Sequence, residues 1–400
     1  MENPKIRFKG FTKDWEQRKF GSLLEETRNK TIFEDEDTLL SCAIDGMYLN
    51  SELFSHFRGS SNIGYLKVKK NDLILSAQNL HLGNCNVNLR FEHGIISPAY
   101  KVYELVGCNP LFMQAWVKKD STKDFFLKSS TEGASVCRKN IVWEELYKQE
   151  LPVPSIEEQT KVGEYFYSLD HLITLHQRKC EQTKKLKKYM LQKMFPQNGA
   201  KVPEIRFYGF TYDWEQRKLG DDLVSIHTGT NLLGSITNTG MPLIKMGNIQ
   251  RGYFDTSKVE FLAENEQPDK ADIANYGDFF FNTRNTLELV GKGATWMKNS
   301  GKYAFNSNIA RFELRNLDTI FFNYLYNTDY MTKQIHARAM GTTSVAAIYP
   351  RTLDSVEYSA PCMKEQQKIG AYFKQLDHLI TLHQRQTDFY KKISFYYISS

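Results

Sequence analysis

Residues 157–178, EEQTKVGEYFYSLDHLITLHQR, return at 364–385 as KEQQKIGAYFKQLDHLITLHQR, with 16 of 22 positions identical, including the last ten. A second segment is repeated as well: IRFKGFTKDWEQRKFG at 6–21 matches IRFYGFTYDWEQRKLG at 205–220 at 13 of 16 positions. We call the segment that begins IRF the first frame and the other the second frame. Because both frames occur twice in the same order, the chain of 400 residues is a duplicated module.

The residues between the frames, roughly 22–150 and 221–358, have diverged. Three short echoes remain, at 97–105 and 307–314, at 110–117 and 319–326, and at 133–136 and 341–345. A surface that meets the same partner twice must stay alike, whereas surfaces that meet different ligands can diverge. We therefore expect the frames to contact common partners and the two interiors to recognise different ligands. The alternative is a recent duplication whose frames retain only their core packing.

The second frame predicts a long helix, because its apolar residues recur in alternating steps of four and three, as in a coiled coil. Ser155 and Glu158 form an expected capping box, and Pro196 ends the helix after about 40 residues, or roughly 60 Å. The predicted stripe comprises Val162, Phe166, Leu169, Ile173, His176, Cys180, Thr183, Lys187, Met190 and Met194, and its second copy comprises Ile369, Phe373, Leu376, Ile380 and His383. The two helices would bury these stripes against each other, antiparallel.

The symmetry of the two copies fails after Arg385. The first copy continues as KCEQTKKLKKYMLQKMF, whereas the second continues as QTDFYKKISFYYISS. Cys362 also stands where Ser155 caps the first helix, so we expect a weaker cap there.

Each interior reads as mixed α/β. Short β-like runs at 73–80 and 278–284 follow turn residues, and the stretches 110–117 and 319–330 are typical of short helices. The predicted fold class is α+β, with two mixed α/β domains related by internal duplication and joined by two long antiparallel coiled-coil helices. We expect a first domain at 1–153, a central helix at 154–196, a second domain at 197–358 and a distal helix at 359–400.

The net charge of +6 is concentrated in one place. Residues 176–201 hold eight Lys and Arg against one acid, so the remainder of the chain sums to about −1. The N-terminus lacks a signal-peptide pattern and no apolar run is long enough to cross a membrane, which predicts a cytoplasmic protein that binds no membrane. Six scattered cysteines without a C-x-x-C pair predict neither a zinc site nor a disulfide framework.

No catalytic chemistry is indicated. Asn109-Pro110-Leu111-Phe112 lacks one proline of the Asn-Pro-Pro-aromatic motif used by amine methyltransferases and is better explained as a helix start. Neither a nuclease pattern of Asp and Glu-x-Lys nor a nucleotide-binding G-x-x-x-x-G-K-[ST] loop occurs. The histidines of each second frame lie five apart, which misses the spacing of helical metal ligands. We expect no catalytic residue, metal or cofactor in this chain.

The interiors do hold residue types that read DNA. Residues 58–103 and 279–315 each carry six Lys and Arg against two acids, interleaved with Asn and Gln, which can pair with base edges while the cations meet phosphates. A solvated surface would have the same composition. The candidate DNA-binding residues are Arg58, Lys67, Lys69, Lys70, Gln78, Asn79 and Arg90 in the first module, and Lys245, Asn248, Arg251, Arg284, Asn285, Lys292 and Arg311 in the second.

Both frames resemble those of the specificity subunits of bacterial type I restriction-modification systems. The residues that carry this resemblance are I-R-F-x-G-F-T-x-D-W-E-Q-R-K-x-G before each module and E-Q-x-K-[VI]-G-x-Y-F-x-x-L-D-H-L-I-T-L-H-Q-R after it, and NTRNTLELVGKGATW (282–296) resembles a target-recognition segment. The resemblance implies two target recognition domains that read the two halves of a bipartite, asymmetric site in double-stranded DNA. It further implies two modification (methyltransferase) subunits docked on the helices and two restriction (translocase and endonuclease) subunits.

S-adenosylmethionine, ATP and magnesium would then belong to those partner subunits. The candidate partner-binding residues, all in the frames, are Trp15, His171, His176, Trp214, His378 and His383. Two other hypotheses remain: a scaffold whose helices and modules bind proteins, and an enzyme with an unrecognised site. Binding to two DNA half-sites in the presence of competitor DNA would distinguish recognition from scaffolding.

Overall fold

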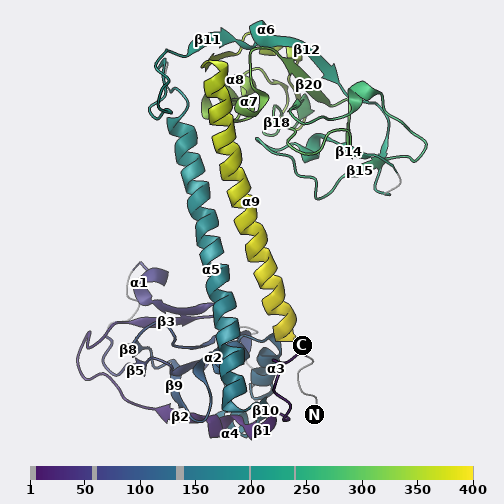
Figure 1. Ribbon diagram of the computed structural model, residues 1–400. Coiled ribbons are helices and arrows are strands. Elements are labelled where there is room, and N and C mark those ends of the chain that lie inside the picture. Colours follow the sequence, from purple (N-terminus) through teal and green to yellow (C-terminus); the bar gives the residue numbers. More distant parts are fainter. Residues whose placement is uncertain (1–5, 56–60, 132–138, 198–199, 238–239, 400) are drawn as a thin grey trace. The chain divides into compact units, whose positions relative to one another are not determined.

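The computed structural model describes residues 6–55, 61–131, 139–197, 200–237 and 240–399, with the backbone alone for 395–399. The fold is α+β, as predicted. It divides into two compact units, one formed by Met1–Arg178 with Gln384–Ser400 and the other by Lys179–His383 (Figure 1). Each unit contains one module and one half of each long helix.

Unit one contains short antiparallel strands and four short helices ahead of the first long helix. Its strands are β1 (Glu16–Lys19), β2 (Leu24–Thr27), β3 (Leu40–Ala43), β4 (Gly46–Leu49), β5 (Leu66–Lys69), β6 (Leu73–Ser76), β7 (Cys85–Val87), β8 (His93–Ile96), β9 (Tyr100–Leu105) and β10 (Glu150–Val153). Its helices are α1 (Asn50–Leu53), α2 (Pro110–Val117), α3 (Asp120–Lys128), α4 (Trp143–Lys148) and the start of α5 (Ile156–Lys193).

Unit two repeats this order with additional short strands. Its strands are β11 (Glu215–Lys218), β12 (Leu223–Thr228), β13 (Gly234–Ser235), β14 (Pro242–Ile244), β15 (Glu260–Leu262), β16 (Phe279–Asn282), β17 (Arg284–Asn285), β18 (Gly293–Thr295), β19 (Ala304–Phe305), β20 (Ile309–Leu314), β21 (Met340–Gly341), β22 (Ala346–Ala347) and β23 (Glu357–Ala360). Its helices are α6 (Leu219–Asp222), α7 (Thr319–Tyr326), α8 (Asp329–His336) and the start of α9 (Met363–Ser399).

The two modules share one sheet topology despite their different sequences. Strands β2-β9-β6-β7 form a four-stranded sheet in unit one, and β12-β20-β16-β18 form its counterpart in unit two. In both units a strand of the first frame pairs antiparallel with the strand that precedes the long helix, β1 with β10 and β11 with β23. The internal duplication is therefore a duplication of fold.

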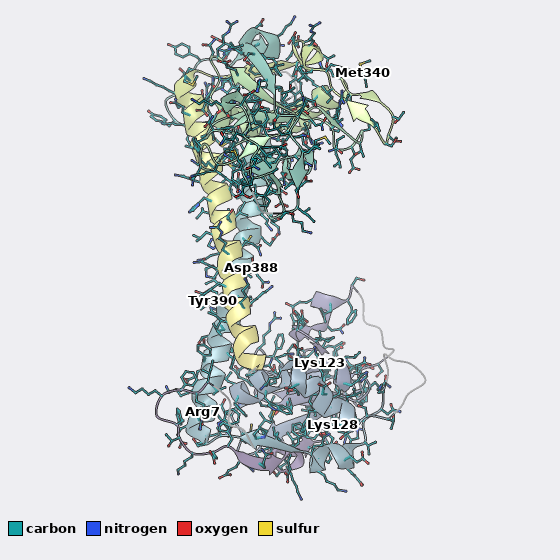
Figure 2. All side chains as sticks on the ribbon, turned by 90° about the vertical axis from the view of Figure 1, so that its right-hand side faces the viewer. Arg7, Lys123, Lys128, Met340, Asp388 and Tyr390 are labelled. Atoms are coloured by element: carbon teal, nitrogen blue, oxygen red, sulfur yellow. The ribbon has the colours of Figure 1, made fainter. Side chains whose placement is uncertain are left out.

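The long helices pack along the predicted stripes. Every residue of the predicted stripe on α5 is at least partly buried, and Ile369, Phe373 and Leu376 of α9 are buried. Within unit two, contacts run from Cys180 with Ile380, through Lys187 with Asp377, to Phe195 with Phe373, so the two helices are antiparallel there. Within unit one, His176 of α5 stacks on Tyr390 of α9 with ring centroids 5.7 Å apart. Figure 2 labels Tyr390 on α9.

The start of α5 corrects part of the predicted capping box. The Ser155 hydroxyl accepts a hydrogen bond from the Glu158 N–H at 3.4 Å, which is one half of the motif. The other half is missing, because the Glu158 carboxylate pairs with Arg7 instead. In α2 the Asn109 side chain caps the N–H groups of Leu111 and Phe112, and Pro110 occupies the first turn. The sequence Asn-Pro is a helix start, as predicted.

One predicted helix is two helices. The stretch 319–330 was expected to be continuous, but α7 ends at Tyr326 and α8 begins at Asp329. The Thr328 hydroxyl accepts from the Met331 N–H and so starts a new helix. Elsewhere, a helix long and apolar enough to cross a membrane is absent from the described part of the chain.

Glycines in the second frame let each long helix approach its module. A Cβ added to Gly163 would lie 2.6 Å from both the Leu111 Cβ and the Phe112 N at the start of α2. At Gly370 of α9 the same addition would lie 2.9 Å from the Phe321 N of α7. Each glycine therefore serves core packing, which is the role that the alternative explanation of the duplication assigns to the frames.

Candidate nucleic-acid interface

In the first module the predicted DNA-binding cations are ion-paired. Lys67 pairs with Glu36, Lys69 with Glu104 at 3.1 Å, and Lys70 with Glu92. Arg90 makes a bidentate pair with Glu52 at 2.8 and 2.7 Å, and its guanidinium lies over the Phe91 ring. Of these acids only Glu92 lies inside the basic window 58–103, and the other three lie outside it. The positive charge of that window is thus largely neutralised in the fold.

These pairs remain open to competition by DNA. The side chains of Lys69 and Lys70 are 64% and 45% exposed, and exposed ion pairs contribute only about 0–1 kcal/mol each. A DNA phosphate can therefore replace the carboxylate of such a pair at a cost of about 0–1 kcal/mol. The hydrogen bond with Glu104 also raises the pKa of Lys69, so the ammonium stays charged in the physiological range.

The polar candidates of the first module lie at the end of strand β6. Gln78 is exposed and its backbone carbonyl accepts from the Lys139 N–H at 3.1 Å. Asn79 is partly buried, and its N–H donates to the Ser76 hydroxyl at 3.2 Å. Arg58 lies outside the described residues.

In the second module two predicted residues, Arg251 and Lys292, lie in one place together with His336, which is not one of the predicted residues. Arg251 is exposed and donates through Nη2 to the His336 Nε2 at 2.9 Å. Lys292 donates to the Gln250 carbonyl oxygen at 2.8 Å. Burial, followed by the positive charge of Arg251, lowers the pKa of Lys292, and the same two causes lower the pKa of His336. We call Arg251, Lys292 and His336 the cationic cluster.

The cationic cluster differs from the paired cations of the first module. Among the described side chains, neither Arg251 nor Lys292 forms an ion pair with an acid, although the negative charge of Glu288 opposes part of the lowering of the Lys292 pKa. Two like charges held close together are stabilised by an anion placed between them. The cluster therefore suits a phosphate group.

Arg284 and Asn285 form strand β17, which pairs with β22 in a small sheet completed by β21. The Arg284 side chain is exposed, and within the described part of the chain it has no hydrogen-bond or ion-pair partner. The Asn285 side chain accepts from the Thr286 N–H at 2.8 Å. Residues 341–345, which comprise the last residue of β21 and the turn to β22, are all exposed and supply three hydroxyl groups, and Figure 2 labels Met340 just before them. We call Arg284 with 341–345 the hairpin edge.

Gly341 is required for that hairpin. Its φ is +131°, and an added Cβ would lie 2.3 Å from the Val345 carbonyl oxygen. The echo of this segment in the first module, at 133–136, lies outside the described residues.

Three predicted residues of the second module have structural partners. Asn248 is 8% exposed and donates to the carbonyls of Asp255 and Lys258, which corrects its prediction as a base reader because its amide is already used. Arg311 contacts the Ile273 carbonyl and Asp278 and lies over the Phe305 ring, so it is held within the module. Lys245 pairs with Glu260 on strand β15.

Some of the predicted partner-binding residues are exposed, and others are packed inside the fold. His171 and His378 are exposed on the long helices. Trp214 is 3% exposed and packs in the core of unit two, which corrects its prediction as a contact surface, and Trp15 packs edge-on against Phe112. His176 and His383 are partly buried at stripe positions, and His176 faces Tyr390 rather than solvent.

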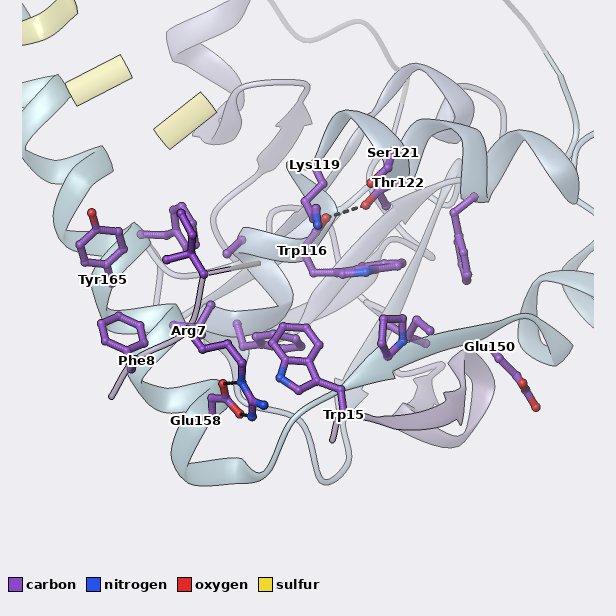
Figure 3. Close-up of a pocket in the computed structure, with 18 residues that line it drawn as sticks. Arg7, Phe8, Trp15, Trp116, Lys119, Ser121, Thr122, Glu150, Glu158 and Tyr165 are labelled. Atoms are coloured by element: carbon purple, nitrogen blue, oxygen red, sulfur yellow. Dashed lines mark hydrogen bonds and ion pairs between the residues drawn. The ribbon is translucent and has the colours of Figure 1, made fainter. Parts of the chain in front are cut away.

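Sequence reasoning missed a clamp between the two frames. Arg7 of the first frame donates to both carboxylate oxygens of Glu158 of the second frame at 2.8 and 2.6 Å (Figure 3). Arg206 and Glu365 repeat this arrangement at 2.7 and 2.8 Å. The signal was present, because the Arg of I-R-F and the Glu of E-Q-x-K recur in both copies.

The basic stretch of α5 is mostly solvated. Lys184 pairs with Glu181, Lys187 with Asp377 and Lys193 with Glu204. The remaining cations of this stretch, Arg178, Lys179, Lys185 and Lys188, are exposed. They form a positive face on the helix rather than on either module.

Comparisons with known proteins agree with this architecture. Residues 212–388 match the family described as type I restriction modification DNA specificity domain. The type I restriction enzyme MjaVIII specificity subunit of Methanocaldococcus jannaschii is 23% identical over 409 residues, covering 94% of this chain and 89% of that protein. The putative type I restriction enzyme MjaX specificity subunit of the same organism is 23% identical over 352 residues, covering 84% and 73%.

A solved structure shares the fold across the whole chain. The S subunit of a type I restriction-modification system from M. genitalium aligns with a TM-score of 0.61 at 12% identity, covering 100% of this chain and 98% of that one. At this identity the likeness is one of fold.

Proposed function

We propose that this chain, which belongs to the specificity subunits of type I restriction-modification systems, reads a bipartite, asymmetric target in double-stranded DNA, one half with each module. The chain itself is non-catalytic. Reading intracellular DNA would place it in the cytoplasm.

The observation that carries this proposal is the contrast between the two modules. Both hold the same frame clamp and the same four-stranded sheet, yet their exposed polar groups differ. The first module offers paired lysines and an arginine with Gln78 and Asn79, whereas the second offers the cationic cluster and the hairpin edge. One scaffold with two unlike polar surfaces suits a ligand with two unlike halves.

The long helices and frames would recruit the catalytic subunits. Two modification subunits would carry S-adenosylmethionine, and two restriction subunits would use ATP and magnesium. The exposed histidines His171 and His378 occupy the same position of the repeat, so each would present the same group to an identical partner.

The test is a gel shift with the cognate modification subunit, performed over a range of salt concentrations with competitor DNA. Specific recognition predicts a complex that survives competitor, protects two separated half-sites, and weakens with salt in proportion to the phosphates contacted. Binding without any sequence preference would instead support a protein scaffold.

A further inference from the structure

The contact between Arg251 and His336 in the cationic cluster fixes the protonation state of the histidine. The Arg251 Nη2 donates to the His336 Nε2 at 2.9 Å. A guanidinium stays charged in the physiological range and can only donate, so the His336 Nε2 accepts and carries no proton. The neutral ring then holds its proton on Nδ1. In this state the histidine has no N–H to offer an anion that binds beside Arg251.

The positive charge of Arg251 acts on both of its neighbours in the cluster. After burial, it is the next cause that lowers the pKa of Lys292 and that of His336. A negative charge placed among the three side chains would therefore favour the protonated form of the histidine. Further ionisable groups close to the cluster or beside it in the chain are Glu288, Tyr326, Lys333 and Arg338.

Helix α7 fixes the loop that carries Arg251. The Asn323 amide donates to the Gly252 carbonyl and the Asn327 amide donates to the Gly293 carbonyl, each at 3.0 Å. The Gly252 N–H also donates to the Gly293 carbonyl at 3.0 Å, which ties the loop to strand β18. The backbone next to Arg251 is thus held in place before any ligand binds.

The turn that carries Lys292 packs against the end of α8. A Cβ added to Gly291 would lie 2.7 Å from the side chain of Ile335, the residue before His336. The Lys292 ammonium donates to the Gln250 side-chain oxygen at 2.8 Å. This acceptor is neutral, and an anion is a stronger acceptor for an ammonium. The lysine is therefore free to exchange Gln250 for a charged ligand.

We propose that the cationic cluster binds a tetrahedral oxyanion of the phosphate class and that His336 takes up one proton when the anion binds. Arg251 and Lys292 would donate to the anion in place of the His336 Nε2 and the Gln250 oxygen. The imidazole, protonated at both nitrogens, would donate from Nε2 to the same anion. The balance is one proton taken from solvent for each anion bound.

Two ligands share this chemistry: a phosphate of the DNA backbone and free inorganic phosphate. The first rests on the proposed function, because it requires the second module to meet DNA. Either ligand places a negative charge beside His336 and so raises its pKa. Binding is then strongest below the pKa of the free histidine and weakens as the pH rises through the pKa of the bound histidine.

The first experiment titrates the full chain with sulfate, which remains a dianion between pH 5 and pH 8. The histidine rings are labelled with ¹³C, and each is followed by NMR in sulfate and in chloride of equal ionic strength. We expect sulfate to raise the titration midpoint of His336 above its value in chloride. The affinity for sulfate should be about tenfold higher at pH 5 than at pH 8.

Variants assign this effect to the cluster. Affinity is read from ¹⁵N-glycine amide signals, because Gly252 follows Arg251 in the chain. His336→Gln keeps an acceptor for Arg251 but cannot take up a proton, so its sulfate affinity should not change with pH. Arg251→Ala should bind sulfate at least tenfold more weakly. The matched control is His227→Gln in the same module, which can still donate to Asp272 and should keep the pH dependence.

The second experiment distinguishes the two sources of the anion. Binding of target duplex by the complex with the modification subunit is measured at pH 6 and pH 8, for the parent and for His336→Gln. A pH dependence that the variant loses identifies a DNA phosphate as the ligand, whereas sulfate binding without it identifies a free anion.

Two results would overturn the proposal. One is a His336 midpoint that sulfate raises no more than chloride does. The other is a sulfate affinity that keeps its pH dependence in His336→Gln, because the proton would then be taken up elsewhere. Failure to bind DNA would refute the proposed function and leave the sulfate result standing, so the two fail separately.

Discussion

Replacing Arg206 by alanine should destabilise unit two far more than unit one. The guanidinium donates to both oxygens of Glu365 at 2.7 and 2.8 Å and to the Tyr212 carbonyl at 2.7 Å. The Glu365 side chain is 0% exposed, so Arg206→Ala leaves a buried carboxylate without its counter-ion. Breaking one side of a buried ion pair typically costs about 3–5 kcal/mol. Because the Arg206 side chain is 15% exposed, we expect a value near 3 kcal/mol, or roughly a 150-fold change in the unfolding constant.

The assay is hydrogen exchange along a urea series, read separately for peptides of each unit. Arg206→Lys should lose part of this stability, since an ammonium cannot make the two parallel bonds of a guanidinium. Replacing both Arg206 and Glu365 by methionine should recover most of it, because no buried charge remains. The matched variant Arg7→Ala should shift the loss to unit one. A loss of stability below about 1 kcal/mol, or an equal loss in both units, would refute the claim that each clamp stabilises its own unit.

Three further predictions follow from single sites. Gly163→Ala should destabilise unit one by about 1–3 kcal/mol in urea unfolding, because the added Cβ would overlap the start of α2. As a control, Ser168→Ala in the same helix should have little effect. Equal effects of the two substitutions would contradict the packing role of Gly163. Arg284→Ala should weaken binding to the half-site of the second module and reduce the salt slope by about one, whereas exposed Lys302→Ala should change neither. Burial raises the pKa of Asp72 from 3.8 to about 6, so the folded state binds more protons than the unfolded state. The contribution of Asp72 to stability is therefore complete below its unfolded pKa and is lost as the pH rises through about 6. Asp72→Asn should therefore be more stable than the parent at pH 7.5, by at most about 3 kcal/mol, and not at pH 4; urea midpoints at both pH values check this.

The parts of the fold predicted from sequence were those set by local patterns. The stripe on α5 and α9, the stop near Pro196 and the helix start at Asn109-Pro110 all depend on residues close together in the chain, and the structure confirmed them. The break between α7 and α8 was missed, because Thr328 caps a helix inside a continuous apolar pattern.

The candidate site was less predictable, because charge neutralisation is a property of the fold. In the basic window, Lys69 pairs with an acid 35 residues away and Arg90 with one 38 residues away, which a count of charges along the chain does not reveal. Asn248 looked like a base reader by residue type, yet its amide is used to hold a loop. Conversely, the Arg7–Glu158 clamp joins residues 151 positions apart, and only the repetition of both residues could have suggested it.

The division of labour between the modules is tested most directly by exchanging residues 22–150 with those of a related specificity subunit and determining the methylation target of the reconstituted complex. The account predicts that one half-site changes while the half-site read by the second module stays the same. A change in both half-sites, or in neither, would contradict the claim that each module reads its own half of the target.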